Sequence, residues 1–300
     1  MIITEIYNGQ GLGNQLHCYI TLRVLALDKG YKFGIQNPEK FKCLEFMDLE
    51  IGEKVVGGEG PEGGPPIKLP DGIKHYFKEK EYWHPNGSDL RNEDERLYEV
   101  QDNTKIEGYF QSEKKLLKYK NEIKKWLKIK LKYDCYDYSD DNICVINFRG
   151  GIYAGVPDFF LNQDYWNNAI QKMWLINTNF KFVVVTDDVK TAKLFFPYFD
   201  VMHYSIGKDY SIIKNAKYLI LSNSSFAFFP TFTSETIKII IAPKYWGRYN
   251  ISDGYWHCGS NIYTGFNYLD KNGNISNFDM CINEYEEYQK LNTNLWNKNI

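Results

Sequence analysis

Arg149 and two glycines directly follow an apolar run in the segment NFRGG, residues 147–151. A guanidinium group at the end of a strand can bind a diphosphate through two parallel hydrogen bonds. Neighbouring glycines allow backbone N–H groups to approach the phosphate oxygens closely. The alternative is an arginine that forms a salt bridge at a domain boundary. The segment therefore predicts either an anion-binding site or a structural ion pair.

Polar residues also follow two other apolar runs. In VVVTDD, residues 183–188, we expect either Asp187 or Asp188 to cap the next helix and the other to accept hydrogen bonds from a ribose or a base. In ILSNSSFAFF, Ser224 and Ser225 stand where a helix begins. A helix N-terminus offers free N–H groups and partial positive charge to a phosphate. Plain helix capping is the alternative for the serines.

The turn GQGLGNQL near the N-terminus contains Gly9, Gly11 and Gly13. A dinucleotide-binding fingerprint needs a further glycine or an alanine three residues after its second glycine. If the fingerprint starts at Gly11, that position is Leu16, and if it starts at Gly9, that position is Asn14. The spacing therefore excludes that class of dinucleotide site. A tight turn with positive φ is the simplest alternative for these glycines.

Predicted strands and helices alternate along the chain. Strands are expected at residues 2–7, 143–148, 181–186, 217–222 and 237–242, and helices at residues 15–29, 163–174, 189–196, from residue 224 and near 282–296. This alternation predicts parallel sheets covered by helices, with ligands bound at the carboxyl ends of the strands. The polar stretch 133–142 is the best linker, so we expect an N-terminal domain of residues 1–138 and a C-terminal domain of residues 139–300.

Three further segments have informative compositions. Residues 55–74 concentrate glycine and proline and must form a loop, and residues 74–90 are expected to be irregular or edge structure. Residues 114–132 combine lysines with apolar residues at helical spacing. We expect an amphipathic helix with a solvated lysine face there, with a membrane-surface role as the alternative.

The overall composition is that of a soluble globular protein: 300 residues, 43% hydrophobic, 17% aromatic and 25% charged, with a formal net charge of -2. No basic field suggests a nucleic-acid partner, and no apolar run is long enough for a transmembrane segment. Six scattered cysteines without metal-ligand spacing suit reduced thiols. We expect a cytoplasmic protein without a signal peptide or structural zinc, and with at most peripheral membrane contact.

The order of these segments resembles that of the α-1,2-fucosyltransferases, whose superfamily includes the core α-1,6 and protein O-fucosyltransferases. The resemblance covers residues 1 to about 246 and rests on GLGNQL, IEGYFQSEKKL, INFRGGIY before YWNNAI, FVVVTDD, and DYSIIKNAKYLILSNSSFAFF with IIAPKYW. It implies a GT-B fold, in which two Rossmann-like domains with parallel sheets face each other across a cleft. It also implies inverting, metal-independent transfer from GDP-fucose to a glycan hydroxyl, with the donor held mainly by the C-terminal domain.

The resemblance also implies roles for individual residues. The glycine turn is similar to the acceptor-side and active-centre loop of the superfamily, in which Asn14 reaches into the cleft. Arg149 would stabilise negative charge on the leaving diphosphate, so Arg149 and Asn14 are the expected catalytic residues. No general base stands out among His17, Glu113 and Asp158. The expected donor contacts are Asn147, Arg149, Asp187, Asp188, Asn215, Ser224, Ser225 and Phe226, and the expected acceptor-side residues are Gly11, Gly13, Asn14 and His17.

The chain departs from the family signature His-x-Arg-Arg-Gly-Asp, because it has Asn147, Gly150 and Ile152 where the family has histidine, the second arginine and aspartate. Two alternatives therefore stay open. One is a glycosyltransferase that uses a different sugar nucleotide, and the other is a carbohydrate- or nucleotide-binding protein without catalytic activity.

A C-terminal extension beyond the family pattern is rich in aromatic residues: Tyr255, Trp256, Tyr263, Phe266 and Tyr268. Its glycines and asparagines argue against a regular helix or a core strand. The rings either close a hydrophobic core where the chain returns to the N-terminal domain or border the acceptor side of the cleft.

Overall fold

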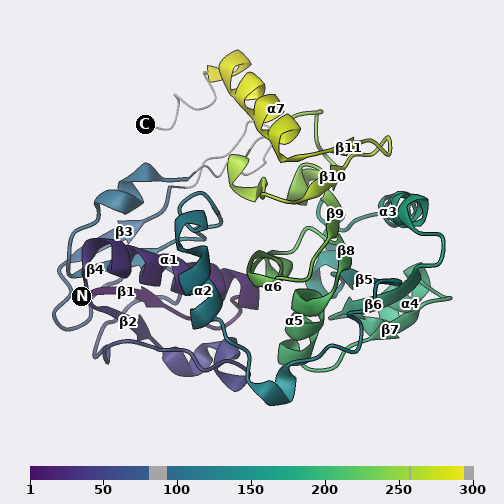
Figure 1. The fold of residues 1–300 in the computed structure, drawn as a ribbon. Coiled ribbons are helices and arrows are strands. Elements are labelled where there is room, and N and C mark those ends of the chain that lie inside the picture. Colours follow the sequence, from purple (N-terminus) through teal and green to yellow (C-terminus); the bar gives the residue numbers. More distant parts are fainter. Residues whose placement is uncertain (81–92, 257, 294–300) are drawn as a thin grey trace. The chain divides into compact units, whose positions relative to one another are not determined.

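A computed structural model of the chain describes residues 1–80, 93–256 and 258–293 (Figure 1). The chain forms two compact units, one containing residues 1–80 and 93–130 and the other containing the residues from Leu131 onward. Each unit has its own parallel sheet with helices, which confirms the predicted α/β class. Among the described helices, none has the length and apolarity needed to cross a bilayer.

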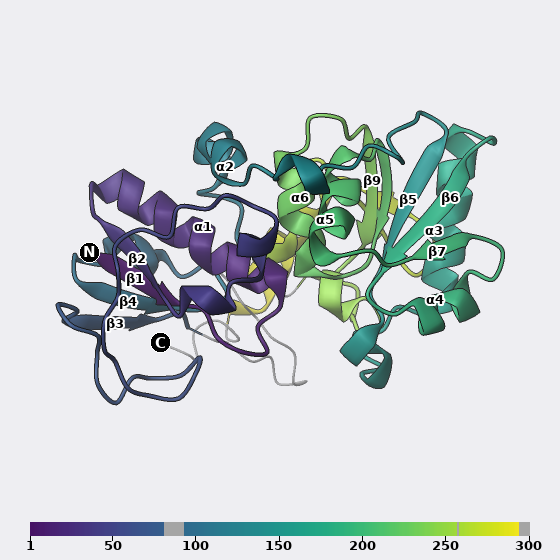
Figure 2. The same ribbon diagram turned by 90° about the horizontal axis from the view of Figure 1, so that it is seen from below.

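The sheet of the first unit has four parallel strands in the order β2-β1-β4-β3. These strands are β1 (Ile2–Glu5), β2 (Phe33–Gln36), β3 (His75–Lys78) and β4 (Thr104–Glu107). Helix α1 (Leu12–Lys29) covers one face of this sheet (Figure 2). It ends at Gly30, whose φ of 68° is a left-handed conformation that glycine adopts without steric penalty.

The sheet of the second unit has the order β11-β10-β9-β8-β5-β6-β7 and is parallel except for β11. Its strands are β5 (Ile143–Phe148), β6 (Lys181–Thr186), β7 (Asp200–Met202), β8 (Tyr218–Leu221), β9 (Ile239–Pro243), β10 (Asn267–Leu269) and β11 (Ile275–Ser276). Its helices are α3 (Gln163–Ile176), α4 (Val189–Phe195), α5 (Ile206–Asn215), α6 (Phe228–Thr233) and α7 (Phe278–Leu291). Helices α3 and α4 lie on one side of the central strands and α5 and α6 on the other (Figure 2). Because both faces are covered, β5 and β6 are apolar over most of their length.

An aromatic core fills the space between the sheet of the second unit and helices α3 and α4. The ring of Phe148 lies 5.3 Å from that of Trp166 and 5.7 Å from that of Phe196. Ile146 belongs to the same core. Since successive side chains of a strand point to opposite faces, Asn147 points to the other face of the sheet.

Residues 55–74 form a loop with one isolated bridge between Glu59 and Lys68, as their glycine and proline content predicts. Strand β3 follows at the edge of its sheet, in line with the edge structure expected for residues 74–90. Residues 81–90 of that prediction lie outside the described part of the chain.

Residues 114–132 do not form the single amphipathic helix that the lysine-rich pattern predicts. Helix α2 spans only Lys120–Trp126, and Ile129 pairs instead with Met47 in an antiparallel bridge. Residues 127–131 alternate strictly between apolar residues and lysine, which is the period of an extended chain. That local alternation ends the helix early.

The stretch expected to be a linker, residues 133–142, lies within the second unit. The backbone N–H of Cys135 donates to Ser211 Oγ at 2.8 Å, and Asn215 Nδ2 donates to Asp134 Oδ1 at 2.9 Å. These hydrogen bonds attach the stretch to helix α5.

The aromatic residues of the C-terminal extension close a core, but it is the core of the second unit. Trp256, 1% exposed, packs edge-on against Tyr268 with ring centroids 5.0 Å apart, and the Tyr263 ring lies 4.5 Å from that of Phe228. Tyr268 belongs to strand β10, so the expectation that this segment holds no core strand is wrong at that residue. Three residues suffice there because parallel pairing with β9 supplies the backbone partners.

We predict that Trp256→Ala lowers the free energy of unfolding by about 3–5 kcal/mol, because it removes a fully buried ring and leaves a cavity. Urea unfolding followed by circular dichroism measures this. Trp174→Ala is the matched control, since Trp174 is 41% exposed and should change stability much less. A folded Trp256→Ala protein of unchanged stability would contradict the packing role.

Candidate functional site

The strand order of the second unit marks one position at the carboxyl edge of its sheet. From β5 the chain continues through α3 to β6 on one side, whereas from β8 it continues through α6 to β9 on the other side. Ligands of open parallel sheets bind in the crevice outside the strand ends at such a switch point. Arg149 follows β5 directly and Ser222 follows β8, so both border this position.

Arg149 already binds an anionic group, which is the protein's own carboxylate. Its guanidinium group forms an ion pair with Asp187, which follows β6, and Asp187 Oδ1 also accepts the backbone N–H of Gly150 at 3.0 Å. The guanidinium carbon lies 5.4 Å from the centre of the Tyr153 ring. Both charged side chains are about one-third exposed, so solvent and an incoming anion can reach the pair.

The two glycines after Arg149 are required by the acidic pair on the neighbouring loop. A Cβ atom on Gly150 would lie 2.6 Å from Asp188 Cβ, and one on Gly151 would lie 2.6 Å from Asp187 Oδ2. Gly151 also has a φ of 47°, which L-residues rarely adopt. The glycines thus bring backbone N–H groups close to an anion, as the sequence suggests, and in this structure that anion is a carboxylate.

The two aspartates have different roles. Asp188 caps helix α4, accepting the backbone N–H of Thr191 at 3.0 Å and its hydroxyl at 2.6 Å. The hydrogen bonds with Thr191 lower the pKa of Asp188. The expectation that one aspartate caps the helix is thereby confirmed, and Asp187 is the one directed toward Arg149.

Ser224 and Ser225 stand at the start of a short helical segment. Ser224 Oγ accepts the Phe226 N–H at 3.3 Å and caps a single 3-10 turn, η7 (Ser225–Ala227), before α6. Helix α6 is only six residues long. The helix dipole is therefore small, and any contact of these serines with a ligand depends on their hydroxyl and N–H groups.

Three buried polar atoms at the switch point have no hydrogen-bond partner among the described residues: Asn147 Oδ1, Ser222 Oγ and Asn223 Oδ1. Asn147 on β5 pairs in register with Leu221, and Ser222 N–H donates to the Asn147 carbonyl at 3.0 Å. Buried polar groups are nearly always hydrogen-bonded, so this cluster is suited to a polar ligand. Sequence reasoning missed Ser222 and Asn223, although the polar run after β8 was the signal.

A second missed pair lies at the same edge of the sheet, directly after β7. His203 Nδ1 is 2.6 Å from Asp209 Oδ2, and Asp209 Oδ1 accepts the Tyr204 N–H at 3.1 Å. Burial raises the pKa of Asp209, and the charge of Asp187 adds to the effect. Asp209 therefore lies within electrostatic range of the Arg149 loop.

One predicted donor contact, Asn215, lies apart from this cluster. Asn215 is the last residue of α5, three residues before β8 begins and thus near the opposite edge of the sheet. Its amide donates to Asp134 and to the Cys135 carbonyl, which is a structural role. Phe226 is half-buried, with its ring 6.2 Å from that of Tyr210.

In the first unit, Asn14 lies in the opening turns of α1 and accepts a hydrogen bond from Gln111 Nε2 at 2.9 Å. This bond joins the first turn of α1, which follows β1, to the loop that follows the adjacent strand β4. Among the glycines of the turn only Gly9 has positive φ, 79°, while Gly11 is the N-cap of α1 and Gly13 is a buried helical residue. The positive-φ expectation therefore holds at Gly9 alone.

His17 is fully buried in α1. Burial lowers its pKa to about 3, and a contact with the backbone of Phe110 opposes this effect weakly. A neutral imidazole inside the protein cannot reach an acceptor sugar, so His17 packs the helix. Of the other two general-base candidates, Glu113 is also buried and Asp158 is exposed.

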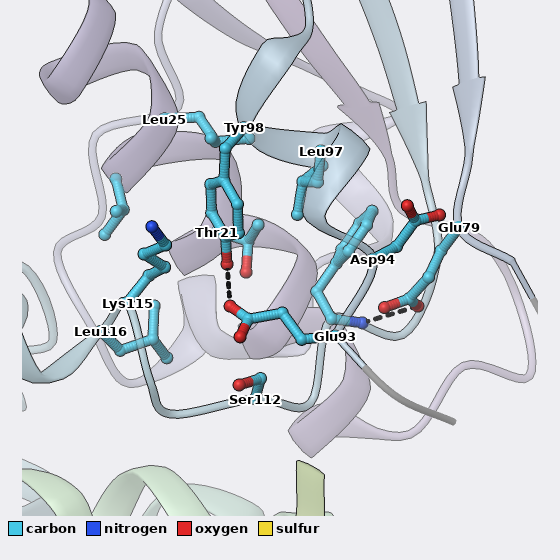
Figure 3. A pocket seen from close by; sticks show the side chains of 12 residues that line it. Thr21, Leu25, Glu79, Glu93, Asp94, Leu97, Tyr98, Ser112, Lys115 and Leu116 are labelled. Atoms are coloured by element: carbon cyan, nitrogen blue, oxygen red, sulfur yellow. Dashed lines mark hydrogen bonds between the residues drawn. The ribbon is translucent and has the colours of Figure 1, made fainter. Parts of the chain in front are cut away.

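A small cavity of about 20 Å³ lies in the first unit beside α1 and the 3-10 helix η3 (Glu95–Glu99). Figure 3 shows the Tyr98 hydroxyl directed at the carboxylate of Glu93, to which it donates a hydrogen bond. Glu79 Oε2 accepts the Phe110 N–H at 3.0 Å. The volume holds about one water molecule, so this cavity is too small for a sugar or a nucleotide.

No protein-family model and no curated protein matches the chain. Several solved structures are similar to it, including the three that follow. An Arabidopsis thaliana FUT1 mutant in complex with GDP is 12% identical, with a TM-score of 0.45 over 80% of this chain and 69% of that one. NodZ alpha-1,6-fucosyltransferase soaked with GDP-fucose is 13% identical, with a TM-score of 0.43 over 81% and 94%. POFUT1 in complex with GDP-fucose is 8% identical, with a TM-score of 0.38 over 80% and 96%.

We predict that, in His17→Gln, the free energy of unfolding decreases less steeply as the pH falls than it does in wild type. The unfolded chain binds a proton at His17 below its ordinary pKa of 6.5, whereas the folded chain does so only near 3. As the pH falls from 6.5 toward 3, the free energy of unfolding therefore decreases by about 1.4 kcal/mol for each pH unit. Urea unfolding between about pH 4 and pH 6.5 measures the slope, with the exposed His75→Gln as control. Equal slopes in wild type and His17→Gln would show that His17 titrates normally.

Proposed function

We propose that the protein is a glycosyltransferase that transfers fucose from GDP-fucose to a hydroxyl group of a glycan, with inversion and without a metal ion. The observation that carries this proposal is the anion site at the switch point of the second unit. There the Arg149 guanidinium and the Gly150 N–H bind one carboxylate together, beside the unpartnered polar atoms of Asn147, Ser222 and Asn223. The resemblance of the segments that carry these residues supports fucose as the sugar.

The way in which the Asp187 carboxylate is bound supports an anion as the ligand of this site. It binds the guanidinium group through one oxygen and the Gly150 N–H through the other, as two oxygens of a phosphate would. An incoming diphosphate displaces Asp187 or shares its donors. Asp187, once released, is free to accept hydrogen bonds from the ribose or the base of the donor.

The proposed chemistry uses Arg149 to stabilise the charge that develops on the leaving nucleoside diphosphate. As the glycosyl–phosphate bond breaks, the sugar acquires oxocarbenium character and the phosphate oxygens gain negative charge. A fixed cationic donor at these oxygens contributes roughly 3–4 kcal/mol to transition-state stabilisation. Asn147, Ser224, Ser225 and Phe226 would contact the donor. Asn14, with Gly11 and Gly13, would contact the acceptor from the first unit.

A donor other than GDP-fucose is the second candidate, and one observation favours it. Gly150 stands where the resembled family has its second arginine, and the side chain of Asp188 occupies the space that a side chain would need there. The donor pocket must therefore differ from that of the family. Calorimetric titration with GDP, UDP and CDP distinguishes the candidates, and binding of none of them would contradict both.

We predict that Arg149→Ala lowers kcat at least about 100-fold while the protein stays folded, because a transition-state donor is lost. Arg149→Lys should recover little, since a point charge does not replace the planar fork of a guanidinium. Transfer assays with GDP-fucose measure kcat, and thermal unfolding reports on the fold.

Asp187→Asn is the control for the ion pair itself. This partly exposed pair is worth no more than about 1 kcal/mol, so its loss should leave the fold intact. If Asp187→Asn and Arg149→Ala unfold the protein equally, the pair is structural and the phosphate-binding role of Arg149 is wrong.

We predict that EDTA leaves transfer activity unchanged. A metal ion that bridges a diphosphate needs carboxylates that converge on it, whereas Asp187 is directed to Arg149 and Asp188 to Thr191. Activity should be assayed after dialysis against EDTA and again with added manganese or magnesium. Loss of activity that either metal restores would assign the protein to a metal-dependent class.

A further inference from the structure

A second arginine lies at the carboxyl edge of the same sheet. Arg248 ends the 3-10 turn η8 (Trp246–Arg248), which follows β9, the strand next to β8. The side chain is 8% exposed, and its Nε, Nη1 and Nη2 atoms have no hydrogen-bond partner among the described residues. A guanidinium group carries five N–H donors, so all of them are unused in a buried position.

Such a group is costly unless an anion accompanies it. Burying an unpaired charge costs several kcal/mol, even after relaxation of the protein. Burial lowers the pKa of Arg248, and the carboxylates of Asp253 and Asp158 oppose this only in part. These groups act at a distance, since none of them accepts a hydrogen bond from the guanidinium group.

The backbone before Arg248 is held in an unusual conformation. Tyr245 and Trp246 have φ values of 65° and 51°, although neither is glycine. The turn is fixed from both sides, because Lys244 Nζ binds Glu284 Oε2 at 2.6 Å and the Tyr245 hydroxyl donates to the Gly254 carbonyl at 2.7 Å. Strained backbone that its surroundings fix in this way is concentrated at binding and catalytic sites.

The loop of residues 157–160 packs against this turn and connects it to Arg149. The Asn250 amide donates to the carbonyls of Pro157 and Phe160 at 2.7 and 2.8 Å. A Cβ atom on Gly247 would be 3.6 Å from the Phe159 ring. Phe159 is 44% exposed and lies 5.8 Å from the Tyr153 ring, which in turn contacts Arg149. Phe160 anchors the end of this loop in the aromatic core, with its ring 5.9 Å from that of Phe148, whereas residues 157–159 are exposed.

We propose that Arg248 is a second anion-binding residue of the second unit, which pairs with a phosphate or carboxylate group of a ligand bound at the carboxyl edge of the sheet. The exposed residues 157–159 move aside to admit the anion. The two sources of such an anion are the diphosphate of a nucleotide donor and the carboxylate of an acidic sugar acceptor. The inference needs neither fucose nor catalysis, so it can hold even if the proposed function fails.

The test uses inorganic pyrophosphate and glucuronate as probes, with wild type, Arg248→Met, Arg248→Lys and Arg149→Ala. In the absence of ligand, Arg248→Met should unfold at the same temperature as wild type or higher, because it removes an unpaired buried charge. Its affinity for one of the two probes should fall about tenfold or more in calorimetric titration. Arg248→Lys should lose less affinity for that probe than Arg248→Met. Arg96→Gln, which alters an arginine already paired with Asp94 in the first unit, should change neither affinity.

Each outcome decides the inference. Weaker pyrophosphate binding by Arg248→Met assigns the anion to the donor, and weaker glucuronate binding alone assigns it to the acceptor. If only Arg149→Ala weakens binding of either probe, Arg248 does not bind anions and the inference is wrong. It is also wrong if Arg248→Met unfolds below the wild-type temperature, or fails to fold, without ligand, because Arg248 is then paired within the protein.

Discussion

The parallel pairing of β5 with both β6 and β8 is the constraint on which the second unit depends. β5 is the first strand of its unit, yet it lies in the middle of the sheet. The chain must therefore leave β5 toward one side and, later, leave β8 toward the other, since parallel strands need crossover connections. The two loops therefore diverge from neighbouring strand ends. Arg149 and Ser222 are the first residues beyond those ends, so the topology itself places both at the switch point.

Charge compensation then distinguishes the two arginines at this edge. Arg149 lies partly in solvent and has Asp187 as a partner, so it is stable without a ligand, and an anion can exchange with the carboxylate. Arg248 has neither solvent nor a hydrogen-bond partner among the described residues. The charge of Arg149 is therefore compensated even without a ligand. The charge of Arg248 is compensated only when an anion binds.

The sequence predicts those features that local composition determines. The apolar runs of β5 and β6 are visible because the sheet is covered on both faces, and Gly30 marks the end of α1. The prediction of a single helix over residues 114–132 is wrong because helical spacing and strict alternation overlap there. The prediction that the C-terminal segment holds no core strand is wrong at Tyr268, because pairing with β9, and not local propensity, makes Tyr268 a strand residue. The burial of Ser222 and the contact of His203 with Asp209 depend on distant segments, so they could not be read from spacing.

The charge balance of the site connects the two arginines. A nucleoside diphosphate carries more than one negative charge, while Arg149 supplies one positive charge that Asp187 already neutralises in part. Gly150 can carry no second cation, because Asp188 occupies the space that a side chain would need. Lys244, at the end of β9, is paired with Glu284. Arg248, in the turn directly after β9, is buried and has no hydrogen-bond partner among the described residues. A diphosphate bound at the switch point would gain a second positive charge from Arg248, because Asp187 partly neutralises the charge of Arg149.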